Sequence, residues 1–165
     1  MIRDLGGGVN GMQSDDQFRL AFDAAIARLA AWADTYSDSA TVQTESVGQY
    51  WRLSLAPQAA NACPVEVILH RDTQSFDIQL GSETYECNRI EAFEIFDQIL
   101  AAVVDGRVVT RHLASANSGA VVAIETGVSL TDTADWNRRR TTEIGANRMP
   151  EDVLVRERQW LAYRR

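Results

Sequence analysis

The sequence predicts an α+β domain in which an antiparallel, hairpin-built sheet carries an N-terminal, a middle and a C-terminal helix packed mainly on one face. Two segments, 15–35 and 89–104, repeat apolar residues at helical spacing. The segments between and after them alternate apolar and polar residues. Turns that contain glycine join several of these alternating segments. The predicted order is α-β-β-β-β-(β)-α-β-β-α.

The length of 165 residues suits one domain. We expect a flexible glycine-rich leader over residues 1–13, a single domain over 14–165, and a basic C-terminal extension over 131–165. The leader matches the dinucleotide fingerprint at Gly6, Gly8 and Gly11. A full buried strand before the glycines and a βαβ unit around them are both missing, which disfavours nucleotide binding.

The first helix begins with a capping box, in which the Ser14 hydroxyl reaches the amide of Gln17. One helical face is apolar, and Ser37-Asp38-Ser39 ends the helix. The apolar positions are Phe18, Phe22, Ala25, Leu29, Trp32 and Tyr36.

A hairpin follows, because Gly48-Gln49 suits a type II′ turn. Pairing across this turn gives one mostly apolar face and one face with an ion pair, and a one-residue slip would destroy both features. The predicted pairs are Ser46–Trp51, Thr44–Leu53, Val42–Leu55, Gln43–Ser54 and the ion pair Glu45–Arg52.

The next strands, 65–70 and 75–80, are joined by a loop over 72–75. This register places Leu69 opposite Ile78 and His70 opposite Asp77. Gly81-Ser82 turns into a short strand, 83–87, in which Tyr85 faces Ile78.

We expect the second helix, 89–104, to be capped by Asn88 with Glu91 at its third position, and to stop at Gly106. Two strands follow, 107–115 and 120–130, around Asn117-Ser118-Gly119. Their register places Arg111 opposite Glu125 and His112 opposite Ile124. Both faces of these strands carry apolar residues, which indicates a central position in the sheet.

For the last 35 residues we expect a short helix around Trp136 within 131–142. A longer helix is expected to start at Met149-Pro150-Glu151-Asp152, since proline and acidic residues favour a first turn.

The composition excludes several classes of protein. The chain has 16 arginines and no lysine, so it has neither a Schiff-base lysine nor a Walker P-loop. Its two cysteines, Cys63 and Cys87, form no CxxC, which argues against a disulfide framework or a zinc site. No run of 18 apolar residues and no signal-peptide core are present, so we expect a cytoplasmic, bacterial protein without a membrane span.

Charge is unevenly distributed along the sequence. Residues 1–135 have eight arginines and nineteen acids, a net of −11, whereas residues 136–165 have eight arginines and four acids, a net of +4. Arg138, Arg139, Arg140 and Arg148 form a candidate basic interaction patch. Internal or subunit salt bridges and an acidic protein partner both remain open, and the acidic body disfavours nucleic acid.

His70 and Asp77 resemble half of a catalytic relay, but no nucleophile motif accompanies them. We therefore expect a polar cross-strand pair there and a core histidine at His112. We assign no catalytic, cofactor-binding or metal-binding residue, because two isolated histidines have no metal-ligand spacing.

Two functional hypotheses follow. The first is a non-catalytic binding or adaptor protein that acts through protein contacts, with a protein partner and a possible homodimer. The order of elements and the acidity resemble those of type III secretion chaperones, which are small acidic dimers, although the chain has extra strands and none of their motifs. The alternative is a small-molecule-binding or enzymatic domain with an apolar pocket between sheet and helix. The candidate pocket residues are Trp51, Phe76, Tyr85 and His112.

Overall fold

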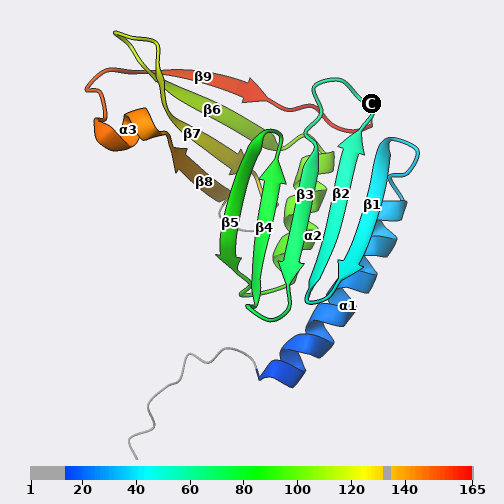
Figure 1. Cartoon of the computed structure of the whole chain (residues 1–165). Coiled ribbons are helices and arrows are strands. Elements are labelled where there is room, and N and C mark those ends of the chain that lie inside the picture. Colours follow the sequence, from blue (N-terminus) through cyan, green and yellow to red (C-terminus); the bar gives the residue numbers. More distant parts are fainter. Residues whose placement is uncertain (1–13, 132–134, 165) are drawn as a thin grey trace, which may run out of the picture.

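The computed structural model describes residues 14–131 and 135–164, so the predicted leader 1–13 lies outside the described residues (Figure 1). The described chain confirms the α+β class, with its strands divided between two antiparallel sheets. The helices are α1 (Asp15–Asp34), α2 (Glu94–Val104) and α3 (Glu143–Asn147). The strands are β1 (Ala40–Val47), β2 (Tyr50–Pro57), β3 (Val65–His70), β4 (Ser75–Leu80), β5 (Glu83–Arg89), β6 (Val108–Ser115), β7 (Val121–Val128), β8 (Trp136–Thr141) and β9 (Val153–Gln159).

The first sheet is a meander in the order β1-β2-β3-β4-β5, and α1 and α2 lie behind it in Figure 1. Its covered face is apolar in alternate positions, because side chains of a strand point to opposite faces. Phe18 and Phe22 of α1 pack with Phe93, which precedes α2, in one aromatic cluster. This cluster belongs to a hydrophobic core that also includes Val108 and Trp136 of the second sheet.

The predictions for α1 and the first hairpin are confirmed. The Ser14 hydroxyl accepts the Gln17 N–H at 3.4 Å, as the capping box requires. The predicted pairs of β1 and β2 are all present, including Glu45 opposite Arg52. Gly48 has a φ of 55°, the left-handed value needed at the first turn position.

The predicted register of β3 and β4 is wrong by two residues. Leu69 lies opposite Phe76, and His70 lies opposite Ser75. The loop between the strands covers residues 71–74 and not 72–75. Gln74 makes this possible by adopting a φ of 51°, a left-handed value that asparagine or glycine usually provides. A two-residue shift leaves every side chain on its face, so alternation alone cannot detect it.

The second helix starts later than expected, because Asn88 belongs to β5. The Asn88 amide donates to the carbonyl oxygens of Tyr85, at 2.9 Å, and Phe76, at 3.2 Å. These bonds hold an irregularity of β5 at which Cys87 has a φ of 57°. The expected contact of Tyr85 with Ile78 across the strands is confirmed.

The second sheet has the order β8-β7-β6-β9, so the predicted central position of β6 and β7 is confirmed. Arg111 lies opposite Glu125 and His112 opposite Ile124, as expected. The helices expected within 131–142 and from Pro150 onward are wrong, because these segments form β8 and β9, and the C-terminal helix is the short α3 between them. Strand β8 pairs with β7 and strand β9 pairs with β6. These pairings satisfy the backbone hydrogen-bonding groups of β8 and β9 and outweigh their local preference for a helix.

The C-terminal residues tie the second sheet back to the first. The Leu161 N–H donates to the Asn61 carbonyl at 2.9 Å, and the Tyr163 hydroxyl donates to the Cys63 carbonyl at 2.6 Å. The indole of Trp160 donates to the Thr110 hydroxyl at 2.9 Å. The last part of the chain therefore packs against the chain's own body.

Candidate protein-interaction site

The four candidate pocket residues lie in different surroundings. Trp51 and Phe76 are buried in the core, where the Phe76 ring packs edge-on against Phe96 with centroids 4.8 Å apart. Tyr85 is buried between the sheets, and its hydroxyl lies 2.7 Å from that of Thr126. Burial raises the pKa of the Tyr85 phenol. His112 is half-buried on β6 of the second sheet. The four candidate pocket residues are therefore divided between the two sheets.

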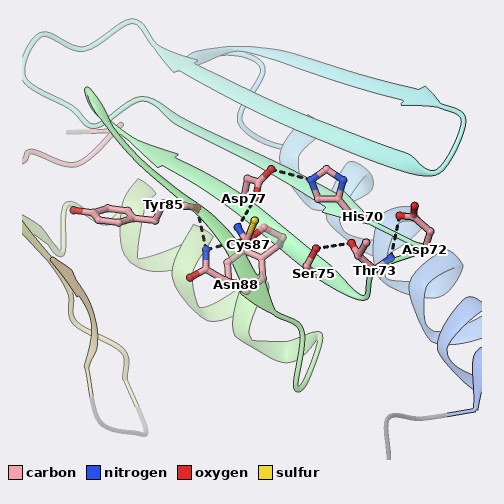
Figure 2. A network of polar contacts seen from close by, with 9 residues as sticks. His70, Asp72, Thr73, Ser75, Asp77, Tyr85, Cys87 and Asn88 are labelled. Atoms are coloured by element: carbon pink, nitrogen blue, oxygen red, sulfur yellow. Dashed lines mark hydrogen bonds and ion pairs between the residues drawn. The ribbon is translucent and has the colours of Figure 1, made fainter. Parts of the chain in front are cut away.

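His70 and Asp77 do meet, although their strands pair in another register (Figure 2). His70 Nε2 lies 2.8 Å from Asp77 Oδ2, and Asp77 Oδ1 accepts the Cys87 N–H at 2.8 Å. The Ser75 hydroxyl, directly opposite His70 in the ladder, is 2.6 Å from that of Thr73. The Asp77 carboxylate therefore links β3 to the irregular part of β5 and stabilises the sheet there.

The predicted basic patch is divided between two faces of the second sheet. Arg138 and Arg140 point toward the first sheet, where Arg140 binds the buried carboxylate of Glu83 through two hydrogen bonds of 2.8 and 3.1 Å. The Arg138 guanidinium stacks on Trp136 at 4.5 Å and donates to the side chain of Asn88. These arginines stabilise the contact between the two sheets.

Arg139 lies on the opposite face, in a row of alternating charge that crosses all four strands. The row runs Arg139, Glu125, Arg111, Glu157 in the observed strand pairing. Arg139 lies 3.5 Å from Glu125, and Arg111 lies 2.8 Å from Glu157. The register predicted for Arg111 opposite Glu125 is confirmed. Its closest carboxylate is nevertheless that of Glu157 on β9, a segment that was expected to be helical.

Arg148 lies apart from the other three, at a shallow cavity of about 710 Å³. The cavity is bounded by the β6–β7 loop, α3 and the segment that leads into β9. Ile144 and Met149 line it and are 55% and 44% exposed. Thr142 fixes α3 here, since its hydroxyl caps the helix at Gly145 and donates to the Val121 carbonyl.

Strand β9 begins at this cavity and forms one edge of the second sheet. Leu154 and Val155 are each 57% exposed, on opposite faces of the strand. Most of the exposed large hydrophobic side chains of the described residues gather in this part of the chain. They are Ile144, Met149, Leu154, Val155 and Leu161, against Leu20 and Val47 elsewhere.

The backbone of β9 offers hydrogen-bonding groups on its open side. The Trp160 N–H donates to Val108, and the Asp152 carbonyl accepts from Ala116, so the even-numbered residues of β9 face β6. Backbone groups alternate along a strand, so Val153, Val155, Glu157 and Gln159 direct their N–H and C=O groups outward. Within the part of the chain that the structure describes, no strand pairs with this side.

The pairing of β6 with β9 has no register shift, and Val153–Gln159 contains no proline. Proteins usually protect an edge strand by proline, bulges, very short length or charged side chains, and β9 has only the last of these, at Arg156, Glu157 and Arg158. The sequence gives little sign of this edge, because apolar and polar residues do not alternate over Val153–Gln159; only the β-branched Val153 and Val155 favour a strand.

Over residues 14–131 and 135–164, no group of three histidine, cysteine or acidic side chains is placed to hold a metal ion. None of the helices described is both long and apolar enough to cross a bilayer. Cys63 and Cys87 are both free thiols. Comparison with known protein families finds no family model that matches this chain, and the searches of curated proteins and of solved structures find no match either.

Proposed function

We propose that this protein is a non-catalytic binding protein of the cytoplasm, and that it acts through protein–protein contacts at the open edge of β9. The occupant is an extended segment of a protein, which adds a strand to the β8-β7-β6-β9 sheet. One observation carries the proposal: β9 combines outward backbone groups with two apolar side chains that are more than half exposed. Two free thiols suit a reducing compartment.

The side chains of β9 indicate the chemistry of that segment. Arg156 and Arg158 are exposed and share one face of the strand, since they are two residues apart. Among the ion pairs of the described residues, neither arginine has a carboxylate partner. An extended segment with an acidic side chain on the same face would therefore gain an ion pair as well as backbone hydrogen bonds.

The test uses a synthetic peptide of alternating valine and aspartate, as long as β9, with fluorescence anisotropy as the measurement. We expect it to bind the native protein and to lose about tenfold or more in affinity to the Val155→Pro variant. Proline removes an N–H that faces the open side, and an edge strand tolerates it there because pairing with β6 is untouched. Val155→Thr keeps the N–H and is the matched control.

A peptide that is methylated at its outward-facing amide nitrogens tests the same bonds without changing the protein. It should bind more weakly than the parent peptide, because methylation removes the donors. Equal binding of both peptides, or no binding of the parent peptide to the native protein, would contradict the proposal.

A further inference from the structure

We infer that the strand which pairs with β9 is β9 of a second copy of this chain, antiparallel and with Val155 on the two-fold axis. The inference rests on the proposed function, because it names the partner of that edge. A two-fold axis perpendicular to a sheet produces an antiparallel pair and joins the two sheets into one continuous sheet. The outward residues Val153, Val155 and Glu157 must then face one another across the axis.

The register centred on Val155 is self-complementary. Val155 lies opposite its own copy, Val153 opposite Glu157, and Leu154 opposite Arg156, whose aliphatic stem can cover the leucine. Asp152 lies opposite Arg158, and the symmetry repeats this ion pair. No residue in this register meets a residue of like charge.

Neighbouring registers place like charges together. Centring on Arg156 puts this arginine opposite itself. Centring on Leu154 puts Glu151 opposite Glu157 on both sides of the axis, and centring on Glu157 puts that glutamate opposite itself. Like charges that face each other across a strand pair are destabilising, so the Val155 register is favoured.

Asp152 and Arg158 are available for this contact in the single chain. Both are exposed, and neither takes part in an ion pair of the described residues. The Arg158 guanidinium stacks on the Trp160 ring at 3.8 Å and donates to the side chain of Asn61 at 3.4 Å, and it exchanges the weaker of these contacts for the ion pair with Asp152 of the second copy. The same face of the sheet carries Leu154 and Arg156, so pairing would cover an exposed apolar side chain.

The test exchanges the charges and measures association by sedimentation velocity. Asp152→Arg alone, or Arg158→Asp alone, creates two like-charge pairs in the dimer, and each should weaken self-association about tenfold or more. An equimolar mixture of the two single variants should dimerise again, because every contact between unlike copies then joins opposite charges. The double variant should also dimerise. This rescue separates lost pairing from lost folding, since an unfolded variant would not be rescued.

Asp38→Arg, an exposed acid distant from β9 in the sequence, is the matched control for net charge and should leave association unchanged. A second measurement fixes the register. With Cys87 replaced by serine, Val155→Cys should form an intermolecular disulfide on mild oxidation, whereas Val153→Cys, which faces Glu157 of the other copy, should not.

The outcomes distinguish the two proposals. A protein that stays monomeric at high concentration but binds the valine–aspartate peptide would overturn the dimer and leave the proposed function standing. A dimer that is insensitive to both charge variants would show that another surface mediates association. Because both partners use the same edge, the peptide should compete with self-association and dissociate the dimer. Failure of the peptide to bind or compete, with a charge-sensitive dimer, would contradict the proposed function and restrict β9 to self-association.

Discussion

The side chains of His70 and Asp77 are joined at 2.8 Å although their backbones are not directly opposite, because His70 pairs with Ser75 and Asp77 pairs with Ile68. The contact is diagonal across β3 and β4, a separation that long polar side chains can span. The second oxygen of Asp77 accepts the N–H of Cys87, at the irregular part of β5. One carboxylate thus connects three strands.

Replacing Asp77 by alanine should destabilise the protein by about 1–2 kcal/mol, since a backbone N–H and an imidazole each lose a charged acceptor. Urea denaturation measures the difference. His70→Ala removes only one of the two bonds and should cost less, about 0.5–1 kcal/mol. If His70→Ala lowered the free energy of unfolding as much as Asp77→Ala, the hydrogen bond from the Cys87 N–H to Asp77 would contribute nothing to stability.

Gly81→Ala should destabilise the protein by about 1–3 kcal/mol, because the added methyl group meets both a backbone and a packing restriction. Gly81 has a φ of 63°, and a Cβ there would lie 2.7 Å from the Trp160 ring. Thermal unfolding gives the stability, and tryptophan fluorescence reports the displaced indole. Gly48→Ala is the control, with a φ of 55° and open space around the Cβ, so it should show the backbone cost alone.

Arg140→Met should destabilise the contact between the sheets by about 1–3 kcal/mol, because it leaves the buried Glu83 carboxylate without its partner. The side chain of Glu83 is 6% exposed and that of Arg140 is 47% exposed. The double variant Glu83→Gln with Arg140→Met removes the charge as well and should recover much of the loss. Chemical denaturation of the four proteins gives the coupling free energy, and additive losses would exclude a direct interaction.

Alkaline pH should weaken the fold through Cys63. Burial raises the pKa of this thiol from its ordinary value of 9.0 to about 12. Between these two values the unfolded chain loses the proton and the folded chain keeps it, so the free energy of unfolding falls as pH rises from about 9 to 12. Burial also raises the pKa of Tyr163, which acts in the same direction. Denaturation measured across this pH range should show a smaller slope in Cys63→Ala.

The two cysteines should also differ in reactivity. Cys87 is exposed and Cys63 is buried, so an aromatic disulfide reagent at pH 8 should modify one thiol rapidly and the second only after unfolding in urea. Rapid modification of two thiols in the native protein would contradict the packing around Cys63. Cys87→Ser is the control and should abolish the rapid phase.

Elements whose signals are local could be predicted from the residues alone. The apolar stripe that includes Phe18 and Phe22 specifies α1, and the turn at Gly48 with alternation on both sides specifies the pairing of β1 with β2. The burial of Trp51, Leu53 and Leu55 follows from the same alternation. These features need contacts within about a dozen residues, so composition and spacing suffice.

Other features depend on residues that are distant along the chain, and they become visible only in the folded protein. The β3–β4 register differs from the prediction by two residues, a shift that leaves each face unchanged and is therefore invisible to a period of two. The segment after Pro150 became a strand because β6 offered an edge to it, and Asn88 joined β5 because Phe76 and Tyr85 present their carbonyls to it. The open edge of β9 has the same origin: only the order of strands in space separates an edge from a centre, and no local pattern contains that order.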